Sequence, residues 1–258
     1  MRALCEFRVV DESADWIVVE KPAPLMVHPA SGKFDEPTLL SGLQHLLAFE
    51  LANGAGLSIL TRLDRETSGL VLVAKNRRAA RHFSLQLQRR QIEKEYLALV
   101  HGWPGWEEQK VERPIVRAGE VGESEIWLRQ RVHSQGRECI TGFRVERRFE
   151  NRRGRFSILR CFPETGRMHQ IRVHLEYLAH PIVGDKVYGD DGRAYLERVA
   201  GGLSEATLER LMLPRHALHA TKLAAEWEGR RMEWSSDLPW DLARFVEGTS
   251  LIQRHDNA

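Results

Sequence analysis

The chain has 258 residues, long enough for one large domain or two modest ones, and we expect a single domain over residues 1–258. Its 38 Lys and Arg residues stand against 36 Asp and Glu residues, and this net charge of +2 excludes the strongly basic composition of a nonspecific DNA coat. Three scattered cysteines form no Cys-x-x-Cys pair, which argues against a disulfide framework or a zinc knuckle. Because no apolar run approaches the ~18 residues of a membrane span, we expect a cytoplasmic protein without membrane contact.

Strand signals open the chain and a helix signal follows them. The β-branched run Trp16–Glu20 stops at Lys21, and Leu25–Val27 restarts it after two prolines, so we expect two strands joined by a stiff turn. Lys21 is a candidate cation of a site, although a lone Lys beside Pro is more often exposed. Leucines then recur at helical spacing from Leu39 to Leu47, which predicts a helix with a buried leucine face.

A dense polar loop, Thr61 to Gly69, leads into the apolar run Leu70–Ala74, which is typical of a buried strand. Asp64 lies between two arginines in this loop, and flanking guanidinium groups favour an ionised carboxylate that serves as a nucleophile or an electrostatic partner. From composition alone, a solvated, salt-bridged turn accounts for the same pattern.

The stretch after the loop is basic. Asn76 is placed to cap a helix on which Arg77 and Arg81 face away from the apolar stripe, so this basic face is a candidate contact for a phosphate-rich substrate. A solvated surface is the more common cause of such a charge run. The alternating segment Glu95–Val100 then predicts a strand that carries Tyr96 near its start.

Strand signals return in the second half of the chain. Cys139–Phe149 and Phe156–Phe162 predict a hairpin with an arginine-rich turn. Thr165 is placed to cap a following helix, on which His169 and Arg172 share one face, so that Arg172 is aimed to meet Asp64.

The remaining segments, together with those before them, indicate the fold class. Leu203–Leu213 predicts a helix, and a last hairpin is expected with one strand ending near Trp227 and its partner around Met232 to Trp234, whereas residues 101–136 give only a weak pattern. Strands that arrive mostly as hairpins, with helices between them, indicate an α+β fold on a largely antiparallel sheet.

Four stretches of the sequence resemble one family. Arg62-Leu63-Asp64-Arg65 followed by Thr67-Ser68-Gly69 is similar to the signature loop of RluA-type pseudouridine synthases, whose Asp is the catalytic residue. Further similar stretches follow in the family's order and spacing: Val19–Pro22 with Val27–Pro29, Lys94–Val100, and Gly166–Leu175 with His180–Asp185 and Tyr188-Gly189. One departure is Thr61, because the family commonly has His just before the Arg-Leu-Asp.

The resemblance implies the pseudouridine synthase fold, a bent, mixed and mostly antiparallel sheet flanked by helices, with a central RNA-binding cleft. It implies an isomerase that converts specific uridines of structured ribosomal or transfer RNA to pseudouridine, without cofactor, metal or obligate protein partner. Many members carry a small RNA-binding domain ahead of the catalytic one. The similar stretches begin near Val9 here, so we expect no separate domain before them.

The resemblance also assigns site residues. Asp64 acts at ribose C1′, either as a nucleophile or as the base that starts an elimination; Tyr96 stacks on the base and is positioned for the C5 proton; and Arg172 pairs with Asp64. Arg62 is the candidate wedge that replaces the extruded base in the RNA stack. The other expected substrate contacts are Lys21, Arg65, Thr67, Ser68, Arg77, Arg81, Arg167 and His169.

Three other functions account for parts of the same sequence pattern. A metal hydrolase finds little support, because His169 and His174 lie five residues apart and no His-Glu-x-x-His is present. A glycosidase needs two facing carboxyl groups, whereas Asp64 and Glu66, two residues apart, point to opposite sides of an extended loop. An RNA-binding module in which Asp64 is only structural would bind RNA without releasing the C5 hydrogen of uridine.

Overall fold

The computed structural model describes residues 6–29 and 36–248, which fold into two compact units. Unit 1 comprises Met1–Tyr96 and His219–Ser236, and unit 2 comprises Leu97–Leu218 and Asp237–Ala258. Each unit is thus built from two separate stretches of chain, and the single domain expected over residues 1–258 stays a prediction. Cys5 lies outside the described residues.

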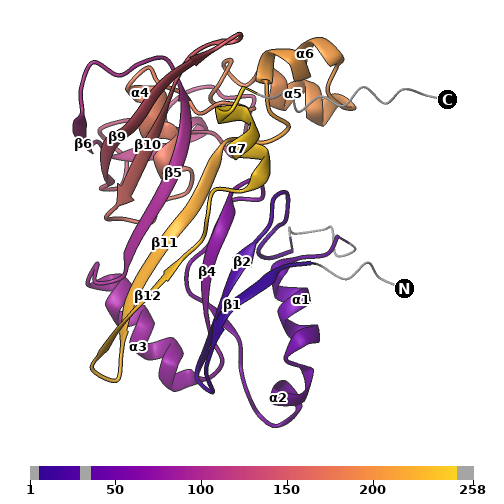
Figure 1. The fold of residues 1–258 in the computed structure, drawn as a ribbon, viewed down its shortest axis with the longest axis vertical. Coiled ribbons are helices and arrows are strands. Elements are labelled where there is room, and N and C mark those ends of the chain that lie inside the picture. Colours follow the sequence, from indigo (N-terminus) through magenta and orange to yellow (C-terminus); the bar gives the residue numbers. More distant parts are fainter. Residues whose placement is uncertain (1–5, 30–35, 249–258) are drawn as a thin grey trace, which may run out of the picture. The chain divides into compact units, whose positions relative to one another are not determined.

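Unit 1 is organised around a sheet in which β4 is central (Figure 1). Its strands are β1 (Arg8–Glu12), β2 (Trp16–Lys21), β3 (Ser58–Ile59), β4 (Ser68–Ala74), β11 (Leu218–Trp227) and β12 (Arg230–Ser235). The order is β1-β2-β4-β11, with β3 on β4 and β12 on β11. Only the β4–β11 pair is parallel among the register pairs of this unit, so the sheet is mixed and mostly antiparallel.

Both faces of this sheet are covered, which explains why the run Leu70–Ala74 is apolar without interruption. All seven residues of β4 are buried, which confirms the buried strand predicted over Leu70–Ala74 and extends it to Ser68. Val71 and Val73 join the core cluster of α1 (Leu39–Leu46), whereas Leu70 and Leu72 join that of α3 (Arg77–Gln88). Successive side chains of a strand point to opposite faces, so a strand covered on both sides needs apolar residues at every position.

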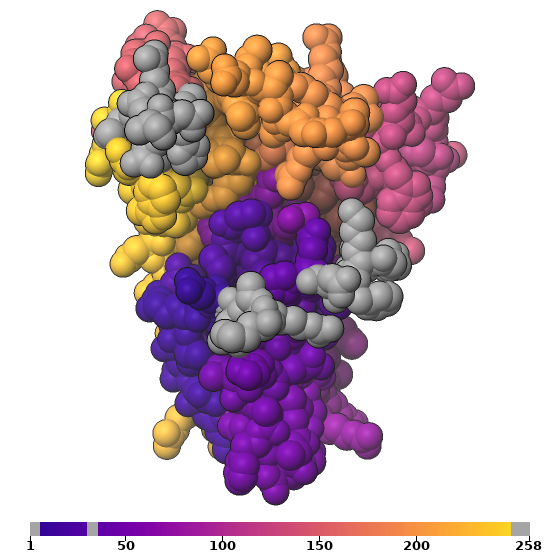
Figure 2. All heavy atoms as spheres, turned by 90° about the vertical axis from the view of Figure 1, so that its right-hand side faces the viewer, coloured from indigo at the N-terminus to yellow at the C-terminus, as the bar shows by residue number. Residues whose placement is uncertain are grey.

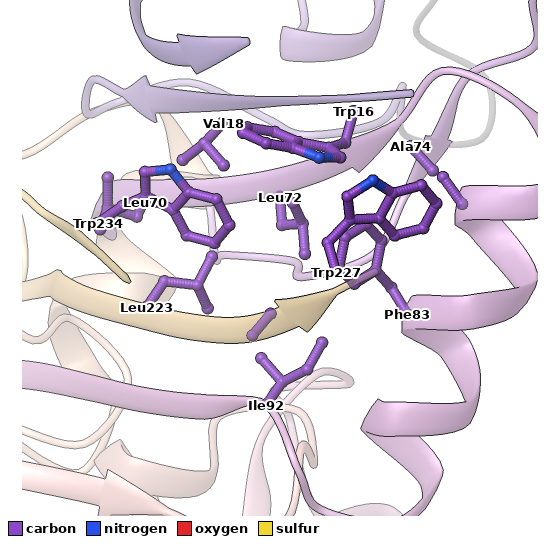
Figure 3. Packing of buried hydrophobic residues seen from close by; sticks show 12 residues of the cluster. Trp16, Val18, Leu70, Leu72, Ala74, Phe83, Ile92, Leu223, Trp227 and Trp234 are labelled. Carbon is purple, nitrogen blue, oxygen red and sulfur yellow. The ribbon is translucent and has the colours of Figure 1, made fainter. Parts of the chain in front are cut away.

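Tryptophans dominate the cluster on the α3 side, around Leu72 (Figure 3). Trp16 meets Trp234 edge-on with 5.2 Å between ring centroids, and Trp227 stacks on Phe83 at the same separation. Aromatic rings bury large apolar areas, and such pairs add about 0.5–1.5 kcal/mol each beyond the burial. This packing fixes β4 from the side of α3.

Two helices of unit 1, α1 and α3, begin at side-chain caps. Asn76 accepts from the backbone N–H of Ala79 at the start of α3, as predicted, and Thr38 forms a capping box with Ser41 before α1. The leucine stripe of α1 is narrower than expected, since Leu46 is 48% exposed. Helix α1 lies close to α2 (Ala48–Ala52), and Figure 2 shows the outer surface of these two helices in violet.

The second N-terminal strand was predicted wrongly. Leu25–Val27 forms no strand but only a single bridge, between Met26 and Thr38. Leu25 instead donates its backbone N–H to the carbonyl of Arg65, 2.9 Å away, while its side chain joins the core. Leu25 and Val27, beside two prolines, therefore contribute to core packing and not to sheet pairing.

Unit 2 contains a second group of paired strands, and β5 (Glu93–His101) passes from unit 1 into it after Tyr96 (Figure 1). Its other strands are β6 (Glu108–Glu112), β7 (Ile115–Arg117), β8 (Gln130–Val132), β9 (Ile140–Asn151) and β10 (Gly154–Pro163). The order is β5-β10-β9-β6, and β7 pairs with β8 in a separate two-stranded sheet. The predicted hairpin is β9–β10, whose turn is tighter than the sequence suggested.

The helices of unit 2 are α4 (Gln170–Tyr177), α5 (Arg193–Ala200), α6 (Glu205–Leu211) and α7 (Trp240–Val246), with a short 3-10 turn at Ala118–Glu120. Ser204 caps α6, which confirms that helix, whereas α5 and α7 were not predicted. Thr165 does not cap α4, because its hydroxyl donates to Gln170 and accepts from the N–H of Ile140. No helix in residues 6–29 or 36–248 is long and apolar enough to cross a membrane.

Candidate active site

The loop that carries Asp64 is a turn held by its own backbone. The N–H of Thr67 donates to the carbonyl of Asp64 over 3.1 Å, and β4 begins at the next residue. Asp64 is half-buried, whereas Arg62 and Arg65 are exposed on either side of it. Arg65 makes a loose ion pair with Glu36 at 3.4 Å. The turn therefore presents a carboxylate next to two accessible guanidinium groups.

Lys21 reaches this loop from the end of β2. Its side chain is fully buried, and its ammonium donates to the carbonyls of Pro22, Leu25 and Arg65 over 2.9, 2.8 and 3.2 Å. A buried ammonium is costly unless its protons are hydrogen-bonded, and carbonyl oxygens satisfy them here. The structure thus places Lys21 at the predicted site, where its hydrogen bonds fix the backbone of the loop.

Thr61, the departure from the family pattern, has a structural partner. Its hydroxyl accepts from the N–H of Leu72 over 2.9 Å, and the N–H of Leu60 donates to the carbonyl of Leu72 over 2.9 Å. Both backbone groups of a central β4 residue are thereby satisfied as the chain leaves β3.

Thr67 and Ser68 are buried at the end of the loop. The hydroxyl of Ser68 lies 2.9 Å from Nδ1 of His219, and Nε2 of the same ring lies 3.1 Å from the hydroxyl of Ser236. The sequence does not single out His219. Its one signal is the position of the histidine between Leu218 and Ala220, in the segment that leads into the strand expected to end near Trp227.

Tyr96 belongs to unit 1 and packs at the base of the loop. It is half-buried against the cluster that contains Leu63, Val71 and Ala220. Leu63 immediately precedes Asp64, so Tyr96 and the catalytic candidate rest on the same core. This packing is consistent with the expected position of Tyr96 close to Asp64.

In unit 2, Arg172 forms a bidentate pair with Asp185. Its Nε and Nη2 lie 2.7 and 2.8 Å from the two carboxylate oxygens, and its guanidinium lies 5.0 Å from the ring centroid of Tyr188. Burial raises the pKa of Asp185, but the charge and hydrogen bonds of Arg172 outweigh burial and hold that pKa well below its usual range. Asp64 lies in unit 1, so its predicted pairing with Arg172 rests on the sequence.

His169 and Arg167 precede α4, where the sequence expected substrate contacts. His169 has a positive φ of 58° at the helix start, and its Nδ1 lies 2.8 Å from the hydroxyl of Tyr188. Arg167 is exposed and donates through Nε to the carbonyl of Glu138 over 3.1 Å. Both side chains are thus oriented by neighbours in unit 2.

Comparison with known proteins decides the family. A family model described as RNA pseudouridylate synthase matches residues 15–177. The ribosomal large subunit pseudouridine synthase D of Haemophilus ducreyi (strain 35000HP / ATCC 700724) is 38% identical over 242 residues, which cover 93% of this chain and 69% of that protein. The protein of the same name from Escherichia coli (strain K12) is 37% identical over 244 residues, with the same coverage. The chain belongs to the RNA pseudouridylate synthase family.

Solved structures of pseudouridine synthases share the fold. The human RNA pseudouridylate synthase domain containing 4 aligns with a TM-score of 0.71 at 22% identity, over 93% of this chain and 92% of that one. Human RNA pseudouridylate synthase domain containing 1 aligns with a TM-score of 0.67 at 24% identity, over 95% of both chains. The predicted α+β pseudouridine synthase fold is confirmed. So is the predicted activity, since the protein is an enzyme that isomerises uridine in RNA to pseudouridine.

The basic surfaces of this pseudouridine synthase differ in how far they are neutralised. On β9 and β10 four arginines pair with carboxylates: Arg144 with Glu108, Arg148 with Glu107, Arg155 with Glu150 and Arg160 with Glu146. On α3, Arg77 and Arg81 are exposed, and within the described residues neither has an ion pair. Unneutralised cations attract phosphate most strongly, so α3 is the stronger RNA candidate.

The histidines that suggested a metal hydrolase have separate partners. His174 is fully buried between the hydroxyl of Thr141, at 2.9 Å, and the carbonyl of Arg113, at 3.0 Å. Nδ1 of His180 lies 2.9 Å from the carbonyl of His101. In the part of the chain that the structure describes, no three His, Cys, Asp or Glu side chains are grouped to hold a metal ion.

Proposed function

We propose that this pseudouridine synthase modifies large-subunit ribosomal RNA in the cytoplasm and that Asp64 is its catalytic carboxylate. The RNA assignment is supported by the relatives at 35–38% identity, which are named ribosomal large subunit pseudouridine synthase D. The observation that carries the assignment of Asp64 is its half-buried position on a turn whose backbone is held by Lys21.

The chemistry needs a carboxylate and a grip on the base. The bond between uracil N1 and ribose C1′ breaks, the base turns, C5 joins C1′, the C5 proton leaves and N1 takes up a proton, so atoms and electrons balance without redox change. Asp64 would act at C1′ as a nucleophile or, alternatively, as the base that starts an elimination in the ribose.

The remaining roles follow the family resemblance. Tyr96 would stack on the uracil and receive the C5 proton, and Arg172 would hold the Asp64 carboxylate ionised and oriented. Extruding a base from structured RNA costs a few kcal/mol, and Arg62 is proposed to fill the vacated place because its guanidinium is planar, exposed and two residues from Asp64.

RNA outside the target nucleotide would be held by phosphate contacts. Arg77 and Arg81 on α3 are proposed for this role because no carboxylate neutralises them within the described residues, and Arg65 and Arg167 because they are exposed beside the motifs. His169 would face the RNA from the start of α4. Such contacts set the affinity and its salt dependence, while the site itself selects the nucleotide.

Release of tritium from RNA labelled at uridine C5 tests the assignment of Asp64. The wild-type protein should release tritium from large-subunit ribosomal transcripts, and Asp64→Asn should release none while binding the same RNA with unchanged affinity. Substantial turnover by Asp64→Asn would show that the catalytic carboxylate lies elsewhere.

The choice of RNA is tested separately, by offering the wild-type protein labelled ribosomal and transfer RNA transcripts in parallel. Faster release from the ribosomal transcripts is expected. Release from transfer RNA alone would overturn the ribosomal assignment without affecting that of Asp64.

A further inference from the structure

A buried chain of hydrogen bonds lies next to the Asp64 loop in unit 1. His219 is fully buried, and its two ring nitrogens lie 2.9 Å from the hydroxyl of Ser68 and 3.1 Å from that of Ser236, which are each 4% exposed. One ring nitrogen of a neutral imidazole donates and the other accepts, so two hydroxyl partners match its capacity.

The end of this chain at Ser236 is firmly anchored. The N–H of Ser236 donates to the carbonyl of Thr221 over 2.8 Å, and the hydroxyl of Thr221 donates to the carbonyl of Ser236 over 2.7 Å. These bonds extend the β11–β12 pairing, in which Lys222 lies opposite Ser235. The imidazole of His219 therefore projects from a fixed part of the sheet.

The other end of the chain is the exit of the loop. β4 and β11 run parallel here, with Ser68 opposite His219 and Gly69 opposite Ala220. Gly69 has φ 113°, and a Cβ on it would lie 2.2 Å from the carbonyl oxygen of Ala220, so only glycine permits this approach. The Ser68–His219 bond adds a side-chain contact to this close backbone approach and fixes the residue at which the loop becomes a strand.

The Asp64–Thr67 turn is consequently held from two sides. The backbone carbonyl of Arg65, within this turn, accepts from the ammonium of Lys21 over 3.2 Å and from the N–H of Leu25 over 2.9 Å. Ser68, the next residue after the turn, is held by His219. A reactive group is placed accurately only when the residues that carry it are themselves fixed.

We propose that His219 is a positioning residue for the isomerisation, which acts through Ser68 to hold the turn that carries Asp64. This inference rests on the proposed role of Asp64. It gives Ser68 a different role from the substrate contact expected from the sequence, because the hydroxyl is buried on the imidazole.

Replacing Ser68 separates positioning from stability. Ser68→Ala should lower kcat for tritium release about 10- to 100-fold, because small displacements of a reacting group cost rates of that order, while the Kd for RNA stays unchanged. Ser157→Ala in unit 2 is the matched control. Ser157 is fully buried and its hydroxyl donates to the carbonyl of Gly102 over 2.9 Å, so this variant loses a similar bond and should keep the wild-type kcat.

A double-mutant cycle tests whether the two residues act as one unit. His219→Gln should also lower kcat, and the double variant with Ser68→Ala should be no slower than the slower single variant. A normal kcat in Ser68→Ala, an effect on Kd alone, or an equal loss of kcat in Ser157→Ala would overturn the positioning role. If His219→Gln does not fold, Ser68→Ala against Ser157→Ala still decides. The role of Asp64 is tested separately, by Asp64→Asn.

Discussion

The guanidinium of Arg172 and the carboxylate of Asp185 form a buried bidentate pair inside unit 2, with side-chain exposures of 6% and 0%. Asp185 also accepts from the N–H groups of Val187 and Tyr188, over 2.9 and 3.1 Å. The carboxylate is thus fixed by backbone, and the guanidinium is fixed by the carboxylate. The orientation of Arg172 is therefore set within unit 2 by the segment after α4.

Removing the charge of Asp185 should destabilise the protein strongly. Asp185→Asn leaves the buried guanidinium of Arg172 without this counter-charge, and we expect a loss of about 3–5 kcal/mol in the free energy of unfolding. Urea unfolding measures it. Asp241→Asn is the control, because Asp241 forms the comparable pair with Arg215 but is 16% exposed, so its loss should be smaller. Equal losses in the two variants would show that the Arg172–Asp185 pair stabilises the protein no more than the Arg215–Asp241 pair.

The same pair predicts a dependence of stability on acid. Because the pKa of Asp185 is held well below its usual range in the folded protein, its contribution is fully present above the unfolded value of about 3.9 and is lost as the pH falls toward the folded value. The difference in unfolding free energy between wild type and Asp185→Asn should therefore be constant from neutral pH to about 5 and shrink below about 4. A difference that stays constant below that range would contradict the depressed pKa.

The arginines of α3 are expected to govern the salt dependence of RNA binding. Arg77→Ala combined with Arg81→Ala should weaken binding and reduce the slope of log K against log salt by about one to two units, since each lost phosphate contact removes about 0.7–0.9. The matched control is Arg144→Ala with Arg160→Ala, which removes the same charge from side chains already paired with Glu108 and Glu146. An equal change of slope in both variants would exclude a special role for α3.

The sequence predicts those parts of the fold and site that depend on local signals. The buried strand β4 and the Asn76 cap follow from an apolar run and a capping residue, and both were found. The start of α4 could not be predicted, because the Thr165 hydroxyl is taken by Gln170 and by the N–H of Ile140, and the helix begins only after His169. A tertiary hydrogen bond here overrides a local capping signal.

His219 shows the same limit within the site. Its partner Ser68 lies 151 positions away along the chain, and nothing near either residue reveals the bond between them. Asp64 could be singled out because flanking arginines and the family motif are contiguous in sequence. The residues that position a reactive group come from distant segments of the chain. The sequence alone therefore identifies the reactive group more readily than the residues that position it.

The hydroxyl of Tyr96 is expected to matter for chemistry. Tyr96→Phe keeps the ring that packs against Leu63 and Val71, so RNA affinity should stay unchanged, while tritium release should slow by about 100-fold or more if the hydroxyl receives the C5 proton. Tyr195→Phe, which removes the hydroxyl of a partly buried tyrosine in unit 2, is the control. Wild-type release by Tyr96→Phe would leave stacking as the only role of Tyr96.

Thr61 should contribute stability through its hydroxyl, which accepts from the buried N–H of Leu72. Thr61→Val keeps the shape of the side chain but leaves that N–H without an acceptor, so we expect a loss of about 1–3 kcal/mol in the free energy of unfolding. Thr61→Ser keeps the acceptor and should lose less, and denaturant unfolding of both variants measures the difference. If Thr61→Val, which keeps the methyl group, unfolds with the wild-type free energy, the hydrogen bond from Leu72 to the Thr61 hydroxyl is not what fixes the start of the loop.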